Sequence, residues 1–348
     1  MPELRRDPLL SRWVIIAPER ARRPQHYGDG TVPAEKTDNA ADPFAEGNER
    51  FTTPEIYAVR PEGGAPDGPG WTLRVVPNKY PALGVEGEWQ APPASGLLDR
   101  VSGIGAHEVV IETPHPRAQL AQLPVERIVD LLTVFRLRME DLYRDRRIVQ
   151  VLPFKNHGRE AGATLPHSHS QIIGLPFISP TMRTQLDSLE PYWAEQGRSL
   201  FTDIIDNELK SGERIVMQGE HTLAYCPYAS GFPFEVVVLP KARQPDFRAI
   251  DEKQSWSLAA ALKTVLLKWK RVLGNVPYNA VLHSAPSSTS FIDVRADYPG
   301  LDSYYWWHIH LVPRLTRQGG FELGSGTQIN IVPPEEAAAA LREVDVAL

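Results

Sequence analysis

Two His-x-His pairs contain four of the ten histidines in this 348-residue chain. His167 and His169 form the first pair, and His308 and His310 form the second. Alternate residues of a β-strand point to the same face, so each pair predicts two imidazoles on one face of a strand. Such imidazoles can bind a metal, act as nucleophile or as acid and base, or simply pack in a core. The sequence around each pair has to distinguish these uses.

The first pair follows a polar loop that contains two glycines, which favours phosphoryl chemistry over packing. The loop FKNHGREAGATLP (154–166) leads directly into His167-Ser168-His169-Ser170-Gln171. Glycine lets a backbone approach phosphate oxygens closely. A neutral imidazole attacks phosphorus and leaves again once it is protonated, and an amide such as that of Gln171 can donate to a phosphoryl oxygen as charge develops. We therefore expect phosphoryl transfer at this motif.

Apolar runs and amphipathic segments predict an α+β fold that would position the histidines. Buried strands that end at or near proline are predicted for the runs WVIIAP, HEVVIETP, IVQVLPF, IIGLP and FEVVVLP. Amphipathic helices are predicted for residues 124–145, 255–274 and 333–344, with Gly274 as the stop of the second. Residues 25–50 have no periodicity, and we expect a long surface excursion there.

An internal repeat is indicated by the way each His-x-His pair is introduced. Strand IVQVLPFKN leads to HSHSQIIGLP, and strand YNAVLHSAP leads to WWHIHLVPR. Two similar α+β halves are expected, each a mainly antiparallel sheet with packed helices. The chain length fits two domains of ordinary size. We place the boundary between residues 1–180, which carry the His167–Gln171 motif, and residues 181–348.

Composition argues against several classes of function. The net charge is −6, from 37 basic and 43 acidic residues, so the overall field would repel a polyanion and nucleic-acid binding is not expected. No apolar run is long enough to span a bilayer, and the first residues lack the apolar stretch of a secretory signal, so we expect a cytoplasmic location and no membrane partner. The single cysteine, Cys226, excludes an internal disulfide and a metal cage of several thiolates.

The sequence resembles the galactose-1-phosphate uridylyltransferase family of the histidine-triad superfamily over almost its whole length. The matching segments, in the family's order, are RRDPLLSRWVIIAPERARRP, VVPNKYPAL, HEVVIETPHP, FKNHGREAGATLPHSHSQI, FPFEVVVLPK, YNAVLHSAP and WWHIHLVPRLTRQGGFELGSGTQINIVPPEEAA. The resemblance implies two histidine-triad-like halves and a nucleotidyltransferase activity. It also implies a nucleotide sugar and a sugar phosphate as partners, and a homodimer.

The resemblance implies roles for individual residues as well. It places the nucleophile at His169, beside His167, and the amide that steadies the phosphoryl oxygens at Gln171. Hydrolases of the superfamily carry a third histidine where Gln171 stands, so transfer is favoured over hydrolysis. Nucleotide contacts are implied for Arg20, Arg23, Asn78, Asn156, Gly162 and Thr164. Sugar-phosphate contacts are implied for Phe321, Glu322 and Gln328.

The chain departs from the family pattern at the metal sites. Many members bind zinc through a Cys-Pro-x-Cys-like pair, but the equivalent stretch here, residues 42–49, contains no cysteine. The positions of a second site found in some relatives are Ser199, Thr202 and Gln244. A residual site would have to come from Asp42, His115 and His167, or from His283, His308 and His310. We predict a metal-independent enzyme without a cofactor.

The expected reaction is ping-pong transfer of a nucleoside monophosphate through an adduct on His169, with UDP-glucose and galactose 1-phosphate as the default pair. Ser168 stands in place of the usual proline and resembles plant-type ADP-glucose phosphorylases, so transfer to inorganic phosphate is the alternative. A hydrolase is a third alternative. A nucleotide-binding module without catalysis is the alternative from another class. The sequence leaves the base, the sugar epimer and the acceptor open.

Overall fold

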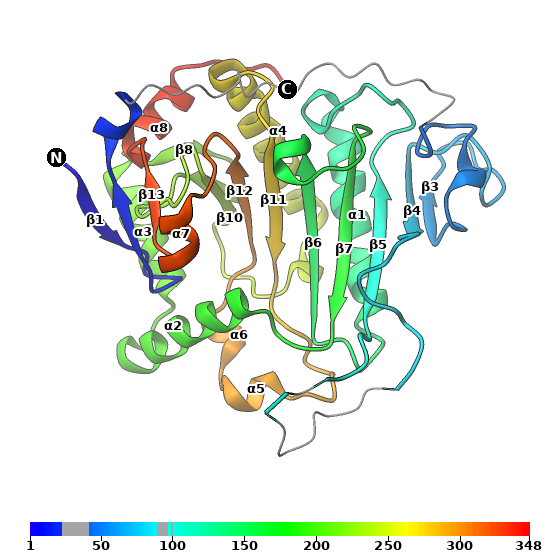
Figure 1. The fold of residues 1–348 in the computed structure, drawn as a ribbon, viewed down its shortest axis with the longest axis horizontal. Coiled ribbons are helices and arrows are strands. Elements are labelled where there is room, and N and C mark those ends of the chain that lie inside the picture. Colours follow the sequence, from blue (N-terminus) through cyan, green and yellow to red (C-terminus); the bar gives the residue numbers. More distant parts are fainter. Residues whose placement is uncertain (23–41, 89–96, 99) are drawn as a thin grey trace.

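A computed structural model describes residues 1–22, 42–88, 97–98 and 100–348 (Figure 1). Its main sheet contains β3 (Tyr57–Val59), β4 (Leu73–Pro77), β5 (Ala106–Ile111), β6 (Gln150–His157), β7 (His169–Leu175), β8 (Ile215–Gln218), β9 (Thr222–Tyr225), β10 (Val236–Pro240), β11 (Tyr278–His283) and β12 (His308–Pro313). The helices are α1 (Val125–Leu142), α2 (Pro180–Gln196), α3 (Leu200–Ser211), α4 (Glu252–Leu273), α5 (Val294–Asp297), α6 (Leu301–Tyr304), α7 (Gly320–Ser325) and α8 (Pro334–Arg342). The five apolar runs all contain strands, β2 (Trp13–Ile16) of a second sheet included, and the three predicted helices are α1, α4 and α8.

The main sheet consists of two units with the same topology. Its ten strands have the order β3-β4-β5-β7-β6-β11-β12-β10-β9-β8. In the first unit α1 connects β5 to β6, and in the second unit α4 connects β10 to β11, so β4-β5-β7-β6 corresponds to β9-β10-β12-β11. The units join edge to edge where β6 pairs antiparallel with β11, with His157 opposite Tyr278. The predicted repeat is therefore present, and the two halves share one continuous sheet.

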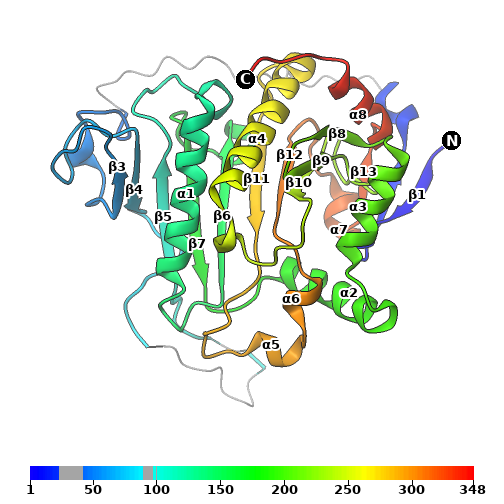
Figure 2. The same cartoon turned by 180° about the vertical axis from the view of Figure 1, so that it is seen from behind.

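The core lies between this sheet and the helices α1 and α4, which pack side by side on one of its faces (Figure 2). Leu131 and Leu132 of α1 and Val265 of α4 are almost fully buried against Val110 and Ile172 of the strands. Each fully buried side chain of this kind contributes about 2 kcal/mol. Because α1 and α4 cover one face of the sheet, alternate side chains of β5, β6 and β7 point away from these two helices, toward the opposite face.

A second core lies beneath α2 and α3, two helices that the sequence analysis did not predict. Met182, Leu186 and Phe201 are buried there with Trp306. Pro191 lies inside α2, which masks the helical pattern of that segment. Trp306 and the neighbouring Trp307 are 4% and 0% exposed, so both belong to the core of this chain.

A small separate sheet lies at the other end of the molecule from β3 and β4 (Figure 1). It contains β1 (Glu3–Arg6), β2 and β13 (Gln328–Asn330), with β13 parallel to β2. Arg5 anchors it to the start of α8 through an ion pair with Glu335 at 2.7 Å. The first and the last parts of the chain are thereby fixed together.

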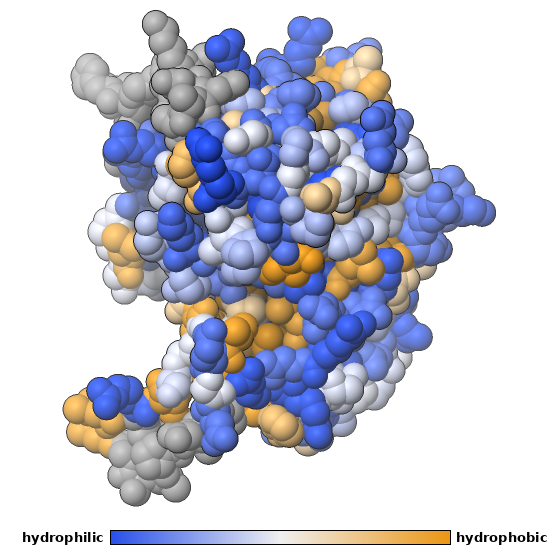
Figure 3. Space-filling view, turned by 90° about the vertical axis from the view of Figure 1, so that its right-hand side faces the viewer, coloured by the Kyte–Doolittle hydropathy of each residue, from blue (hydrophilic) through white to orange (hydrophobic). Residues whose placement is uncertain are grey.

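The surface beside β3 and β4 is mainly hydrophilic, with apolar side chains gathered in a recess across its middle (Figure 3). In the part of the chain that the structure describes, no helix combines the length and the apolar character that crossing a membrane requires.

Candidate active site on strand β7

The side chains of His169 and Gln171 lie on the face of β7 that α1 and α4 leave uncovered. Their neighbours across the β5 pairing are Ile111 and Val109. Ile172, which alternates with them, points instead into the core beneath α1. The strand begins at His169, so His167 precedes it and does not share its pleat.

The imidazole of His169 is held with one nitrogen available for reaction. Its Nδ1 lies 2.7 Å from the backbone carbonyl of His167, and a carbonyl only accepts, so Nδ1 carries the proton. Among the described residues, no hydrogen bond engages Nε2. Burial lowers the pKa of His169 below its ordinary value and the nearby Lys155 charge acts in the same direction, whereas the bond to His167 opposes both. At neutral pH the ring is therefore neutral, with a basic Nε2.

His167 is buried and held by oxygens on both sides of its ring. Its Nδ1 lies 2.7 Å from Oδ2 of Asp42, and its Nε2 lies 2.7 Å from the carbonyl of Thr113. Burial raises the pKa of Asp42, but hydrogen bonds from His167 and from the Phe44 amide bring it below its usual range. The ring of Phe44 packs edge-on against His169, with 5.4 Å between centroids. The segment that begins at Asp42 thus closes over both histidines.

Gln171 accepts a hydrogen bond from a residue that the sequence analysis missed. Its Oε1 lies 2.8 Å from Nε2 of His107, which is on β5. Nδ2 of the Asn78 side chain lies 3.1 Å from the same nitrogen, and the backbone N–H of Asn78 donates to the His107 carbonyl. Of the residues expected to contact the nucleotide, Asn78 is therefore beside Gln171. The spacing of β5 and β7 in the sequence contains no signal for this contact, because register is set only when the strands pair.

The end of β6 and the loop that leads from it to β7 carry three more of the expected nucleotide contacts. Asn156 accepts from Asn279 at 2.8 Å, and Asn279 also donates to the carbonyl of Ala161. Gly162 has φ +89°, a conformation that only glycine adopts without strain, and Thr164 is exposed nearby in sequence. The loop is thus fixed at its base by β11 and leads into the two histidines.

The remaining expected contacts lie far from His169 within one chain. Arg20 is in the 3₁₀ turn Pro18–Arg22, and Gln328 pairs with Val14 in the small sheet. Phe321 and Glu322 are on α7, which lies beside β13 on the other side of β11 and β12 from β7 (Figure 1). Arg23 lies outside the described residues. One chain therefore does not bring these side chains to the histidines.

A buried ion pair lies behind β7, on the helix side of the sheet. Nζ of Lys155 is 2.8 Å from Glu112 and also donates to the carbonyl of His169 at 3.0 Å. The hydroxyls of Ser168 and Ser170 both donate to the Glu112 carboxylate, at 2.5 Å each. Sequence reasoning did not single out this network. It holds the backbone on both sides of the proposed nucleophile.

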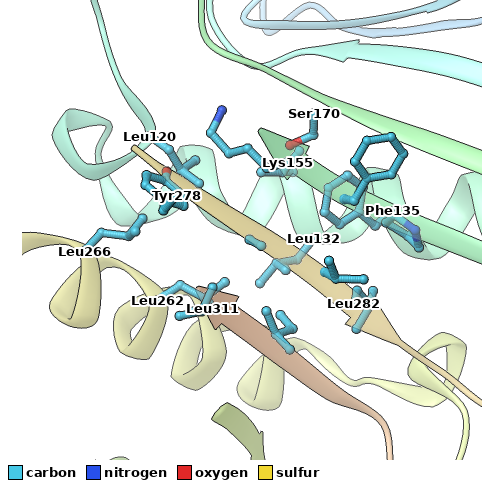
Figure 4. Close-up of a pocket in the computed structure, with 16 residues that line it drawn as sticks. Leu120, Leu132, Phe135, Lys155, Ser170, Leu262, Leu266, Tyr278, Leu282 and Leu311 are labelled. Carbon is cyan, nitrogen blue, oxygen red and sulfur yellow. The ribbon is translucent and has the colours of Figure 1, made fainter. Parts of the chain in front are cut away.

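A cavity of about 40 Å³ lies in the core next to this ion pair (Figure 4). Its walls are mainly apolar side chains of α1, α4 and β11, and Lys155 and Ser170 are on its edge. The cavity faces away from His169, and it is too small for a nucleotide.

The comparisons with known proteins cover both halves of the chain. Residues 1–179 match the family model for the galactose-1-phosphate uridyl transferase N-terminal domain, and residues 185–347 match that for the C-terminal domain. The chain belongs to the galactose-1-phosphate uridyl transferase family. It is accordingly a nucleotidyltransferase.

Individual family members are similar over their full length. An ADP-glucose phosphorylase of Arabidopsis thaliana is 34% identical, over 99% of this chain and 93% of its own. A galactose-1-phosphate uridylyltransferase of Thermotoga maritima is 27% identical, over 99% of both chains. The crystal structure of the Arabidopsis thaliana ADP-glucose phosphorylase with bound ADP-glucose superimposes with a TM-score of 0.83 at 32% identity, covering 99% of this chain and 100% of that one. These matches confirm the predicted family, fold class and enzyme class.

The residues at the family's metal positions do not fit a metal ion here. Both ring nitrogens of His167 lie 2.7 Å from oxygens of Asp42 and Thr113, so neither is directed toward an open metal position. His115 is exposed, whereas Asp42 and His167 are buried. The hydroxyl of Ser199 donates to the carbonyl of Tyr304, and the side-chain oxygen of Gln244 accepts a hydrogen bond from the indole N–H of Trp307. Among the described residues, no three His, Cys, Asp or Glu side chains form a group that could hold a metal.

The alternative metal group, His283, His308 and His310, contacts other protein groups instead of a metal position. His308 donates from Nδ1 to the carbonyl of Trp306 and lies 3.2 Å from the amide of Gln185. His283 stacks on His308, and His310 lies 2.8 Å from Glu235. Burial lowers the pKa of His308 to about 4 and lowers that of His283 well below its ordinary value, so both are neutral side chains of the core.

Proposed function

We propose that the protein transfers a nucleoside monophosphate from a nucleoside diphosphate sugar through a covalent adduct on Nε2 of His169. The observation that carries the proposal is the orientation of His169. Its Nδ1 proton is fixed on the His167 carbonyl, and the neutral Nε2 lies next to the amide of Gln171 on one strand face. A nucleophile with a fixed tautomer and an adjacent donor is the arrangement that this chemistry requires.

In the first step the lone pair of Nε2 attacks the α-phosphorus, and a P–N bond forms while the bond from phosphorus to the bridging oxygen breaks. The sugar 1-phosphate leaves with that electron pair. In the second step a phosphate oxygen of the acceptor attacks phosphorus, the P–N bond breaks, and its electrons return to Nε2. His169 keeps its Nδ1 proton throughout, and the His167 carbonyl stabilises the positive ring of the adduct.

His167 and Gln171 have distinct roles in this proposal. His167 is a positioning residue, since Asp42 and Thr113 hold its ring and its carbonyl orients His169. Gln171 donates its side-chain NH₂ to a phosphoryl oxygen. Asn156 at the end of β6, Gly162 and Thr164 in the loop that follows, and the side chain of Asn78 contact the nucleotide.

Two donor and acceptor pairs are consistent with this mechanism. ADP-glucose with inorganic phosphate is supported by the 34% identity to the Arabidopsis thaliana ADP-glucose phosphorylase and by Ser168 in the motif. UDP-glucose with galactose 1-phosphate is supported by the family models and by the 27% identity to the Thermotoga maritima uridylyltransferase. The first pair is favoured among these because the similarity is greater.

We propose a homodimer in which the second copy supplies the missing contacts. Phe321, Glu322 and Gln328 would then reach the His169 of the partner, which agrees with their distance from it within one chain. Phe321 is 50% exposed and available for such a contact, whereas Gln328 is 7% exposed at the end of the small sheet. Residues 1–180 would carry the nucleophile and 181–348 the sugar-phosphate contacts. A cytoplasmic location stays a prediction.

Intact-protein mass spectrometry tests the proposal directly. The protein is incubated briefly with ADP-glucose or with UDP-glucose without an acceptor, and the adduct is mapped after digestion at alkaline pH. We expect one nucleoside monophosphate on His169, none in His169→Gly, and an unchanged adduct in the control His115→Ala. The nucleotide that labels the protein identifies the base. Absence of an adduct with both sugars, or an adduct that persists in His169→Gly, would contradict the covalent mechanism.

A further inference from the structure

We infer that His107 is a positioning residue for nucleotidyl transfer, because it fixes which end of the Gln171 amide faces the reacting phosphate. This inference rests on the function proposed above and goes beyond it. His107 lies on β5, its ring is 2.8 Å from Gln171, and it contacts no other residue of the His167–Gln171 motif by a hydrogen bond.

The tautomer of His107 follows from its two ring contacts. The backbone amide of Ala82 donates to Nδ1 at 3.1 Å, so Nδ1 is the acceptor and has no proton. In the neutral ring Nε2 must then carry the proton. Two side chains lie at Nε2: Gln171 presents its Oε1 at 2.8 Å, and Asn78 presents its Nδ2 at 3.1 Å. The amide nitrogen of Asn78 cannot accept a proton, so the N–H of His107 donates to Oε1 of Gln171. The NH₂ group of Gln171 is consequently directed away from His107.

The position of the Ala82 amide is itself rigid. The segment after Asn78 is held against β5, because the Asn78 amide donates to the His107 carbonyl and the Gly105 amide donates to the Gly84 carbonyl, both at 2.8 Å. A Cβ on Gly105 would lie 2.3 Å from the carbonyl of Gly174, so the backbones there are in close contact. This packing fixes the ring of His107 and, through it, the Gln171 amide.

The orientation matters because the two ends of an amide have opposite polarity. With NH₂ toward the phosphate, Gln171 stabilises the negative charge that develops on the phosphoryl oxygens. With the amide turned over, Oε1 would repel the same oxygens. Nothing in the amide itself favours one orientation, since the two ends have nearly the same shape. The Nε2–H of His107 supplies the preference.

Two substitutions test the roles of Nδ1 and Nε2 of His107 separately. His107→Gln can place an amide N–H where Nε2 was, and therefore keeps the donor to Gln171. His107→Asn can reach only as far as Nδ1, keeps the contact to Ala82 and loses the donor. Rapid-quench measurement of adduct formation at saturating nucleotide sugar should show His107→Asn slower by about tenfold. His107→Gln should recover most of that loss.

A double-mutant cycle with Gln171→Ala distinguishes positioning from a structural role. Gln171→Ala alone should slow adduct formation by about a hundredfold, the effect of losing one donor to the developing charge. In the Gln171→Ala background, His107→Asn should cause no further loss, because the group that it positions is gone. The Kd for the nucleotide sugar should change less than twofold in Gln171→Ala and in His107→Asn. Additive losses, or His107→Gln as slow as His107→Asn, would overturn the inference.

A measurement without turnover keeps the inference separate from the proposed function. In ¹⁵N NMR of histidine-labelled protein, His107 should show an unprotonated Nδ1 and a protonated Nε2. The opposite tautomer overturns the inference even if the adduct forms. If wild-type protein forms no adduct but the tautomer is as expected, the proposed function fails, and the role of His107 in transfer fails with it.

Discussion

Replacing Lys155 by methionine removes the cation that balances the buried carboxylate of Glu112. The two groups are 2.8 Å apart, and their side chains are only 5% and 1% exposed. Methionine keeps most of the apolar stem of lysine, so the change is mainly one of charge. After Lys155→Met, Glu112 retains the hydroxyl donors of Ser168 and Ser170 and no positive partner.

The expected loss follows from this geometry. Removing one partner of a buried ion pair costs about 3–5 kcal/mol, because the other charge stays buried without compensation. The two serine hydroxyls still solvate Glu112, so we expect about 3 kcal/mol for Lys155→Met. A protein of ordinary stability has about 5–15 kcal/mol in total, so the variant should fold but unfold at clearly lower denaturant.

Lys263 offers a matched control. Its Nζ is buried as well, but within the described residues it donates only to the carbonyl of Leu123, at 2.7 Å. Lys263→Met therefore leaves a neutral acceptor without a partner, at a cost of about 1 kcal/mol. Urea unfolding followed by tryptophan fluorescence at pH 7 compares the two variants, since Trp71, Trp269 and Trp307 are buried. The double variant Lys155→Met with Glu112→Gln should recover part of the loss.

The pH dependence gives an independent check. Burial raises the pKa of Glu112, but Lys155 and the two serines bring it below its usual range. In the wild type, the ionised Glu112 therefore stabilises the fold at any pH above the ordinary pKa of a glutamate. This stabilisation is lost as the pH falls through the lower pKa that Glu112 has in the folded protein. In Lys155→Met, burial raises the pKa of Glu112, so Glu112 of the folded variant takes up a proton as the pH falls. The difference in unfolding free energy between the variant and the wild type should therefore become smaller below pH 7. Equal losses in Lys155→Met and Lys263→Met at pH 7 would refute the reasoning.

Three further predictions concern pH and metals. Burial lowers the pKa of His169, so the rate of single-turnover adduct formation should stay constant as the pH is lowered to 6.5 and should decline only when the pH is lowered further. A decline that begins above pH 6.5 would contradict this. Burial brings the pKa of His157 and of His308 to about 4, so the unfolded chain binds more protons than the folded one between pH 4 and about pH 6.5. As the pH is lowered through this window, the free energy of unfolding should therefore fall by up to roughly 3 kcal/mol per histidine. The fall should be smaller in His157→Gln. Because the Asp42 carboxylate engages His167, dialysis against EDTA should leave transfer unchanged; a loss that zinc restores would contradict it.

The local features of this protein were predictable because they depend on neighbours in the sequence. The helical spacing of apolar residues predicted α1 and α4, and the apolar runs predicted β5, β6 and β7. Alternation along β7 placed His169 and Gln171 on one face. The repeated strand and His-x-His pattern predicted two halves, and the structure has the same topology in both.

Only the tertiary structure decided which side chains surround the histidines. Asp42 meets His167 across 125 positions, and His107 meets Gln171 across 64. Glu112 finds Lys155 only because β5, β7 and β6 are adjacent in the sheet. Contacts of this kind depend on strand order and register, and a shift by one residue would turn each side chain to the other face. The sequence by itself therefore determined the family, the helices α1, α4 and α8 and the candidate nucleophile, whereas pairing across the sheet determined how that nucleophile is held.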